Sequence, residues 1–397
     1  FDWVPWASVL DKLQLKNSHQ SKDYLHGFRT ISIDFGKAEF LKQQYQNIHF
    51  YAQRLPENVW SMTMKEDVIF AELKYAPHQN MLSGYVSSWQ FDLPDVEASG
   101  APTRSKTAWK PGQIPNLKLK VGTLQVGDVN AGQLSLKGTQ IQGKAWRLDS
   151  GKLKSDAYEL VVKGEWQAKP KPETKLDAQV TISDLKKALA HWHGSPVVEA
   201  HDGDIRLLGE WDGAPNDFSV KGLSGQLQIA FKEGRIPNLS PETEKKMVLG
   251  KLLSILSLQT IPRRLKLDFS DLAKPGYSFD KFDGHFVLAH GIMQTEDSAI
   301  DGPVARATIK GSLNLDKQLY DLSLHVSPYI TASLPVVATI AGGPVAGLAT
   351  WVASKIINQG MEKIKGYTYD VSGPWDEPVV QQVHIYKKQA SSDKQLN

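Results

Sequence analysis

The chain has 397 residues, of which 41% are hydrophobic and 22% are charged, and its formal net charge at pH 7 is +3. This composition supports a hydrophobic core, and it argues against intrinsic disorder and against electrostatic binding of nucleic acid. There are no cysteines, which excludes disulfide scaffolds, thiolate zinc sites and cysteine nucleophiles. Because the first residue is Phe1 rather than Met, we expect a piece of a longer protein, with any targeting segment upstream.

After a short helix predicted over residues 1–15, the chain reads as β-strands. In residues 29–35 the apolar Ile31, Ile33 and Phe35 alternate with polar residues, the period of a half-buried strand. The same pattern predicts strands at residues 45–52, 58–64, 68–75 and 81–93.

Residues 98–115 are rich in proline, glycine, serine and threonine, and we interpret them as an irregular crossover or linker. Beyond this segment the alternation becomes regular at residues 117–124 and 132–138. The apolar positions of these two strands include Leu117, Leu119, Leu134 and Leu136.

A Gly-Xaa-Trp corner closes a strand at residues 164–166, 209–211 and 373–375. The spacing of these corners is irregular, whereas a solenoid holds a fixed period, so the pattern favours a β-meander with similar corners. Two interpretations of the tryptophans stay open, namely packing at the sheet edge and binding of carbohydrate.

Two helices are predicted among the strands. Residues 183–193 begin at Ser183, which suits an N-cap, and end before Gly194. Residues 241–258 follow Ser240 and carry a broad apolar stripe.

Strands return after the second helix, at residues 265–270, 282–289, 291–302, 304–316 and 320–326. Apolar residues alternate with polar ones in the first and last of these runs. Their apolar positions are Leu265, Leu267, Phe269, Leu322, Leu324 and Val326.

Residues 327–354 contain no charged side chain, which raises the question of a membrane span. Prolines and the pair Gly342-Gly343 break the stretch, so we expect a short element followed by an amphipathic helix from Pro344 to about residue 363. Three interpretations of this segment stay open: packing on a sheet, contact with a membrane surface, and a true membrane span. The apolar positions of this helix are Val345, Leu348, Trp351, Val352 and Ile356.

Catalytic and metal-binding patterns are weak. His191 and His193 lie two residues apart on a predicted helix, where their side chains point in different directions, although His201 and Asp202 follow nearby. No nucleophile elbow, phosphate-binding glycine loop or zinc-protease signature is present in the sequence. We therefore expect no metal, no cofactor and no enzyme.

Several runs of the second half resemble a known family: residues 250–272, residues 282–303, SLPVVATIAGGPVAG at 333–347 and YDVSGPWDEPVV at 369–380. Their order and spacing resemble the C-terminal region of YhdP-type proteins, members of the AsmA-like superfamily of bridge-like bacterial lipid transfer proteins. Residues 132–166 also resemble the repeating β-unit of this family.

The resemblance implies a mainly β fold, in which a long twisted antiparallel β-sheet curls into a taco-like apolar groove, with a few short helices and a C-terminal amphipathic helix pair. It implies non-enzymatic transport of phospholipid between the inner and outer membranes of Gram-negative bacteria, with the groove shielding the acyl chains. The chain would be a periplasmic part of a longer protein, anchored in the inner membrane by a segment absent here. No nucleic acid partner is expected.

We expect three parts: an N-terminal β segment of the groove at residues 1–112, repeating β-hairpin units at 113–238, and a groove end at 239–397 with helices at 241–258 and 334–364. The last helix would cap the groove or contact the inner leaflet of the outer membrane through its apolar positions. The predicted lipid-binding residues are Ile31, Ile33, Phe35, Leu117, Leu119, Leu134, Leu136, Leu265, Leu267, Phe269, Leu322, Leu324 and Val326. A closed hydrophobic core would show the same alternation of apolar and polar residues, so a core role for these residues stays open beside the lipid-binding role.

Two other functions stay open. An envelope scaffold or chaperone would help outer-membrane proteins to assemble by pairing its sheet edges with strands of envelope protein partners. A polysaccharide-binding β-protein would use some of the eleven tryptophans.

Overall fold

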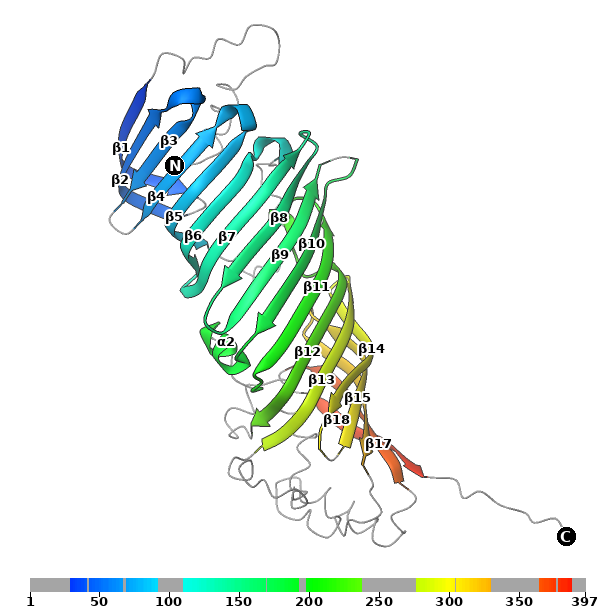
Figure 1. Cartoon of the computed structure of the whole chain (residues 1–397). Coiled ribbons are helices and arrows are strands. Elements are labelled where there is room, and N and C mark those ends of the chain that lie inside the picture. Colours follow the sequence, from blue (N-terminus) through cyan, green and yellow to red (C-terminus); the bar gives the residue numbers. More distant parts are fainter. Residues whose placement is uncertain are drawn as a thin grey trace, which may run out of the picture. The chain divides into compact units, whose positions relative to one another are not determined.

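The computed structural model describes residues 29–40, 43–66, 69–91, 110–168, 170–192, 198–237, 276–303, 305–329, 364–375 and 378–387. Within these ranges the protein is mainly β, as predicted, and only short helical elements interrupt the strands (Figure 1). The predicted helices at 1–15 and 241–258 and the predicted strand at 265–270 lie outside the described residues, as does the predicted helix at 334–364 except for its last residue, Ile364, which begins a strand. The curled groove and its three-part division stay predictions.

The chain divides into two compact units. Unit 1 comprises Phe1–Thr181 and Arg206–Leu223, and unit 2 comprises Ile182–Ile205 and Ser224–Asn397.

The strands β1 to β9 of unit 1 lie side by side in chain order (Figure 1), and β10 pairs with β9. Each run predicted as a strand from residue 29 to residue 138 overlaps a strand of the structure, although Asn58 belongs to a 3-10 turn. The bounds are β1 (Thr30–Phe40), β2 (Gln43–Arg54), β3 (Trp60–Lys65), β4 (Phe70–Ala76), β5 (Met81–Phe91), β6 (Asn116–Val126), β7 (Val129–Ile141), β8 (Ala145–Lys154), β9 (Tyr158–Gln167), β10 (Glu173–Ile182) and β11 (Asp202–Asp212). Short 3-10 turns occur at Pro56–Asn58, Pro77–Gln79, Pro111–Gln113 and Pro215–Asp217.

The prediction of an antiparallel sheet is wrong at one pair, because β5 and β6 run parallel. Parallel neighbours need a connection that returns the chain to the starting end of the first strand, whereas antiparallel neighbours need only a tight turn. The connection between β5 and β6 contains the residues that the sequence predicts as a crossover or linker. Proline and glycine in that segment therefore accompany a connection after which the chain runs in the same direction as before.

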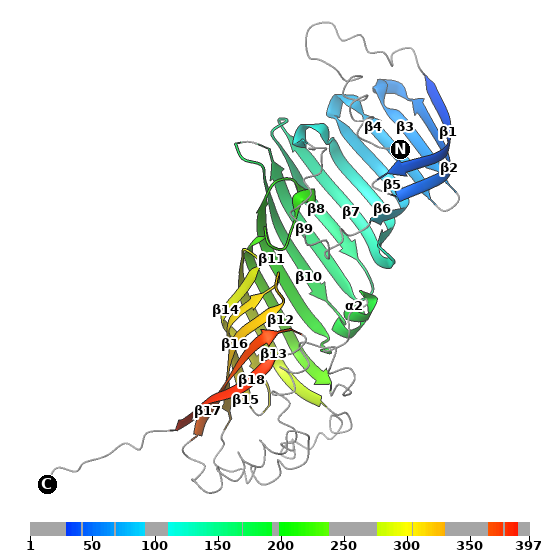
Figure 2. The same cartoon turned by 180° about the vertical axis from the view of Figure 1, so that it is seen from behind.

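Unit 2 contains a second run of antiparallel strands, each paired with the next in the chain (Figure 2). The bounds are β12 (Ser224–Pro237), β13 (Gly276–Ala289), β14 (Ile292–Asp301), β15 (Ala305–Asn314), β16 (Leu319–Pro328), β17 (Ile364–Pro374) and β18 (Val379–Lys387). The strands predicted at 282–289, 291–302, 304–316 and 320–326 are confirmed as parts of β13 to β16.

A contiguous hydrophobic core fills one face of the unit 2 strands. Its buried members come from β13, β14, β15 and β16, and half-buried aromatic side chains pack against them. The rings of Phe231 and Phe282 stack with their centroids 6.3 Å apart and an interplanar angle of 24°. The buried members are Phe279, Ile300, Ala305, Ala307, Leu324 and Val326.

The helix α2 (Leu185–His191) confirms the helix predicted from residue 183, but its N-cap is not Ser183. Asp184 is the capping residue, because its side chain accepts a 3.0 Å hydrogen bond from the backbone N–H of Lys187. Leu185 and Ala188 are buried, so α2 packs through one face. Both side chains can accept such a bond, but the helix begins one residue later than predicted, after Asp184, whose backbone is extended (φ −150°, ψ 99°).

Candidate functional site

The apolar side chains of unit 1 gather on one face of its sheet. Residues that lie directly opposite each other on neighbouring strands share a face, so the register assigns each residue to a side. Starting from Ile31, a row of mutually opposite residues crosses from β1 to β9. This row is Ile31, Ala52, Met62, Leu73, Gly84, Leu119, Leu136, Gly151 and Val162.

Parallel rows complete this apolar face of unit 1. One row contains Ile33 and Leu134, and another contains Leu117, while Phe35 lies opposite Ile48. The structure therefore places all seven predicted lipid-binding residues from β1, β6 and β7 on the same face. All seven are half-buried, so they are neither core residues nor freely exposed.

The opposite face of unit 1 is polar. Lys118 and Lys120 alternate with the apolar residues of β6, and Lys120 lies opposite Ser135. Ser135 in turn lies opposite Lys152 of β8. Since lysine ammonium groups stay in water, this face is the hydrated one.

The predicted residues of unit 2 are packed more tightly. Leu324 and Val326 have exposed fractions of 4% and 3% and belong to the hydrophobic core, whereas Leu322 is half-buried. Leu324 and Val326 therefore serve as core residues of unit 2, and a lipid-binding role for Leu322 stays a prediction. Outside the described residues lie Leu265, Leu267, Phe269, Val345, Leu348, Trp351, Val352 and Ile356.

Two of the three corner tryptophans pack into the fold. Trp166 and Trp211 have exposed fractions of 4% and 8%, and the indole N–H of Trp211 donates a 3.0 Å hydrogen bond to the carbonyl oxygen of Ala214. The third, Trp375, is half-buried with its ring centroid 6.0 Å from that of Tyr320. Trp166 and Trp211 thus favour the packing interpretation over a sugar-stacking platform.

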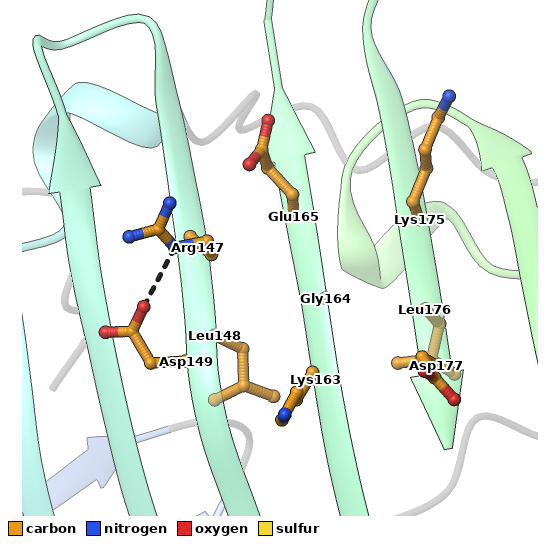
Figure 3. A pocket seen from close by; sticks show the side chains of 9 residues that line it. All are labelled: Arg147, Leu148, Asp149, Lys163, Gly164, Glu165, Lys175, Leu176 and Asp177. Carbon is orange, nitrogen blue, oxygen red and sulfur yellow. Dashed lines mark hydrogen bonds and ion pairs between the residues drawn. The ribbon is translucent and has the colours of Figure 1, made fainter.

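Charged side chains from β8, β9 and β10 surround a shallow depression of about 440 Å³ in unit 1 (Figure 3). Arg147 lies opposite Glu165, and Leu148 lies opposite Gly164 on the other side of the sheet. The lining contains three cationic and three anionic side chains, so their charges cancel. The lining residues are Arg147, Leu148, Asp149, Lys163, Gly164, Glu165, Lys175, Leu176 and Asp177.

Several of these charged side chains form ion pairs or hydrogen bonds within unit 1. The guanidinium of Arg147 donates a 2.8 Å hydrogen bond to Asp149, and Thr139 donates a 2.6 Å hydrogen bond to the same carboxylate. Burial alone would raise the pKa of Asp149, but these two hydrogen bonds lower it below its usual value. Arg206 binds Asp177 through two hydrogen bonds of 3.0 and 3.2 Å. Two of these interactions, Thr139 with Asp149 and Arg206 with Asp177, join different strands, so several charged residues beside the depression are paired within the sheet.

Metal binding has no support in the part of the chain that the structure describes. No three histidine, aspartate or glutamate side chains come together there as a metal-ion site would require. The imidazole of His191 instead lies edge-on to the ring of Trp192, with the centroids 6.3 Å apart. His193 lies outside the described residues.

Helices of the described ranges are too short or too polar to cross a bilayer.

Comparison with known proteins gives one family and one curated relative. A family model described as YhdP protein matches residues 1–380. The intermembrane phospholipid transporter YhdP of Escherichia coli (strain K12) is 27% identical over 244 residues, which cover 61% of this chain. Those residues cover only 19% of the relative, so the chain spans a small part of its length. No solved structure matches.

Proposed function

Because the chain belongs to the YhdP family, we propose that the apolar face of unit 1 binds the acyl chains of phospholipids, as one part of a longer protein that moves phospholipid between two membranes. The observation that carries the proposal is the half-buried state of seven aliphatic or aromatic side chains on one face of the sheet. The name of the Escherichia coli relative supplies the class of ligand.

Hydrophobic burial accounts for binding on such a face. The strands β6 to β9 have 10 to 13 residues, which corresponds to about 33 to 43 Å of apolar strip along the strand direction. Each acyl methylene that leaves water contributes about 0.8 kcal/mol. The face needs no hydrogen bond to hold a tail, and it therefore accepts tails independently of the headgroup.

The two faces of the sheet separate the tail from water. A phospholipid tail on the apolar face lies on Leu119 and Leu136, while Lys118 and Lys120 keep the other face hydrated. Lipid can move along the face because neighbouring rows present similar side chains, so each short step exchanges one apolar contact for another. No catalytic group takes part in such movement.

We infer that the chain works in the periplasm, as part of a protein that an inner-membrane anchor outside this chain holds in place. The word intermembrane in the name of the relative supports this location. The helix predicted at residues 334–364 would then deliver lipid to the inner leaflet of the outer membrane. Envelope proteins at that membrane are the expected protein partners.

A photocrosslinking experiment tests the proposal. We would place a photoreactive amino acid at Leu119, on the apolar face, or at the adjacent Lys118, on the polar face, in the full chain. After irradiation in cells, we expect covalent capture of phospholipid from position 119 and little from position 118. Equal capture at both positions, or capture of protein strands alone at position 119, would contradict lipid binding and favour the scaffold function.

A further inference from the structure

Lysine side chains gather on the polar face of unit 1, where the register places them in two neighbouring rows across β4 to β8. The first row is Ser61, Lys74, Ser83, Lys118, Lys137 and Ser150, and the second row is Thr63, Glu72, Tyr85, Lys120, Ser135 and Lys152. The five lysines of these rows are all exposed. We call them the lysine patch: Lys74, Lys118, Lys120, Lys137 and Lys152.

Carboxylates do not neutralise the lysine patch. Within the described ranges, no ion pair involves any of its five lysines. Glu72 is the one carboxylate in the two rows between β4 and β8. Asp149 of β8 is already bound by Arg147 and Thr139. The patch therefore presents five cations against one carboxylate.

Two lysines of the patch face each other directly, because Lys118 of β6 lies opposite Lys137 of β7. Like charges at directly opposite positions of neighbouring strands destabilise a sheet. Elsewhere in unit 1 a cation lies beside an acid, as where Lys171 binds Asp212 at 2.7 Å. The fold gains nothing from the opposed lysines, whereas an anionic ligand would bind both of them.

The spacing of the lysine patch matches an extended polypeptide. Lys118 and Lys120 are two residues apart on β6, which corresponds to about 7 Å. Side chains two residues apart in an extended peptide point to the same side with the same spacing. Lys137 and Lys152 continue the two rows on β7 and β8, with about 5 Å between neighbouring strands. A chain with an acidic residue at every second position therefore fits the ammonium groups along β6.

The lysine patch offers a lipid bilayer no apolar anchor. Tyr85 is the aromatic residue between its lysines, and the hydroxyl oxygen of Tyr85 occupies the space that a side chain at Gly122 would fill, so the ring lies along the sheet. Binding to a membrane surface adds burial of apolar side chains to electrostatic attraction. The patch also contains no arginine, whose planar guanidinium binds phosphate through two parallel hydrogen bonds. Protein carboxylates therefore suit this surface better than lipid phosphates.

We propose that the lysine patch is a docking surface for an acidic segment of another protein. The segment lies extended along β6 and directs aspartate or glutamate side chains at every second residue toward Lys118, Lys120 and the lysines of β7 and β8. This inference does not depend on lipid binding, because the segment occupies the polar face and acyl chains would occupy the apolar face. A protein partner and a lipid can therefore bind the same strands at once.

Fluorescence anisotropy of a labelled peptide tests the docking surface with the full chain. The peptide alternates glutamate with serine, and the control peptide alternates glutamine with serine. We expect the chain to bind the first peptide and not the second. Binding should weaken as salt shortens the Debye length from about 30 Å at 0.01 M to about 3 Å at 1 M. Equal binding of the two peptides, or no binding of either, overturns the proposal.

Charge reversal locates the bound peptide. One variant combines Lys118→Glu with Lys137→Glu, and its control combines Lys37→Glu with Lys144→Glu, two exposed lysines outside the patch. Both variants carry the same net charge, so a difference between them comes from position. We expect the Kd for the acidic peptide to rise at least about tenfold in the first variant and less than about threefold in the control. Equal weakening overturns the proposal.

Circular dichroism checks that these variants fold, and Lys118→Gln with Lys137→Gln replaces the first variant if it does not. Phosphatidylglycerol vesicles test the membrane alternative: vesicles that bind more tightly than the peptide, and lose binding in the first variant, overturn the proposal in favour of a membrane. Lys137→Gln alone removes the like-charge pair, so we expect weaker peptide binding and undiminished resistance to urea. Unchanged peptide binding by Lys137→Gln, or a loss of stability, assigns this lysine to the fold and overturns its role in docking.

Discussion

Glycine residues decide how closely side chains approach the apolar face. At Gly138 the missing side chain admits the indole of Trp146, whereas at Gly36 no atom lies within 4 Å of the position that a Cβ would take. The two glycines look alike in the sequence, since each lies within an alternating strand. Their neighbours across the sheet give them different roles.

At the scale of the residue we predict that Gly138→Ala lowers the free energy of unfolding by about 1 to 3 kcal/mol, because the added methyl group forces the indole of Trp146 from its place. Gly36→Ala is the matched control and should change that free energy by less than about 0.5 kcal/mol. Urea unfolding followed by tryptophan fluorescence measures both. Equal effects of the two substitutions would show that the indole has room to move.

At the scale of the element, two adjacent residues at the start of α2 can each serve as its N-cap. Ser183 and Asp184 both suit an N-cap, and the structure selects Asp184. The hydrogen bond from the backbone N–H of Lys187 is the largest influence on its carboxyl and lowers the pKa of Asp184. A lowered pKa in the folded state means that this contribution to stability is present near neutral pH and is lost as the pH falls through the lowered pKa.

We predict that Asp184→Ala lowers the stability of α2 by about 1 kcal/mol at neutral pH. Asp184→Asn keeps the hydrogen-bond acceptor without the charge, so it should retain most of the stability and lose the dependence on acid pH. Hydrogen exchange of the α2 backbone amides, measured at neutral pH and in acid, reports both effects. Faster exchange in Asp184→Asn than in Asp184→Ala would contradict the cap.

At the scale of the whole molecule, the important property is that apolar rows continue across many strands of unit 1. Leu136 occupies the middle of one row, opposite Leu119 on one side and Gly151 on the other. Its chain neighbour Ser135 lies on the polar face, opposite Lys120 and Lys152. A charged side chain at residue 136 would interrupt the apolar row, whereas a charged side chain at residue 135 would add to a hydrated surface.

We predict that Leu136→Lys reduces the phospholipid that copurifies with the chain, because a tail crossing residue 136 would have to desolvate an ammonium group. Ser135→Lys should copurify as much phospholipid as the unchanged chain. Quantitative mass spectrometry of extracted lipid measures the difference, and circular dichroism checks that both variants fold. If Leu136→Lys retains the full amount of lipid, the row does not bind tails.

The sequence by itself determined the strands and the two sides of each strand, because the period of two in residues such as Ile31, Ile33 and Phe35 is a local property of extended backbone. It also indicated the crossover before β6, but it left packing and carbohydrate binding both open for Trp166 and Trp211, which their burial in the structure decided in favour of packing. The resemblance pointed to the family and hence to the class of ligand.

Only the tertiary structure decided which sides of different strands belong together, since alternation carries no information about register between strands. The register placed Ile31, Leu119 and Leu136 in one row and made β5 and β6 parallel. Burial also depends on neighbours that the local pattern does not specify, which is why Leu324 and Val326 became core residues while Leu117 and Leu134 stayed half-buried. Strand pairing likewise brings Trp60 opposite Tyr75 and Trp146 opposite Trp166.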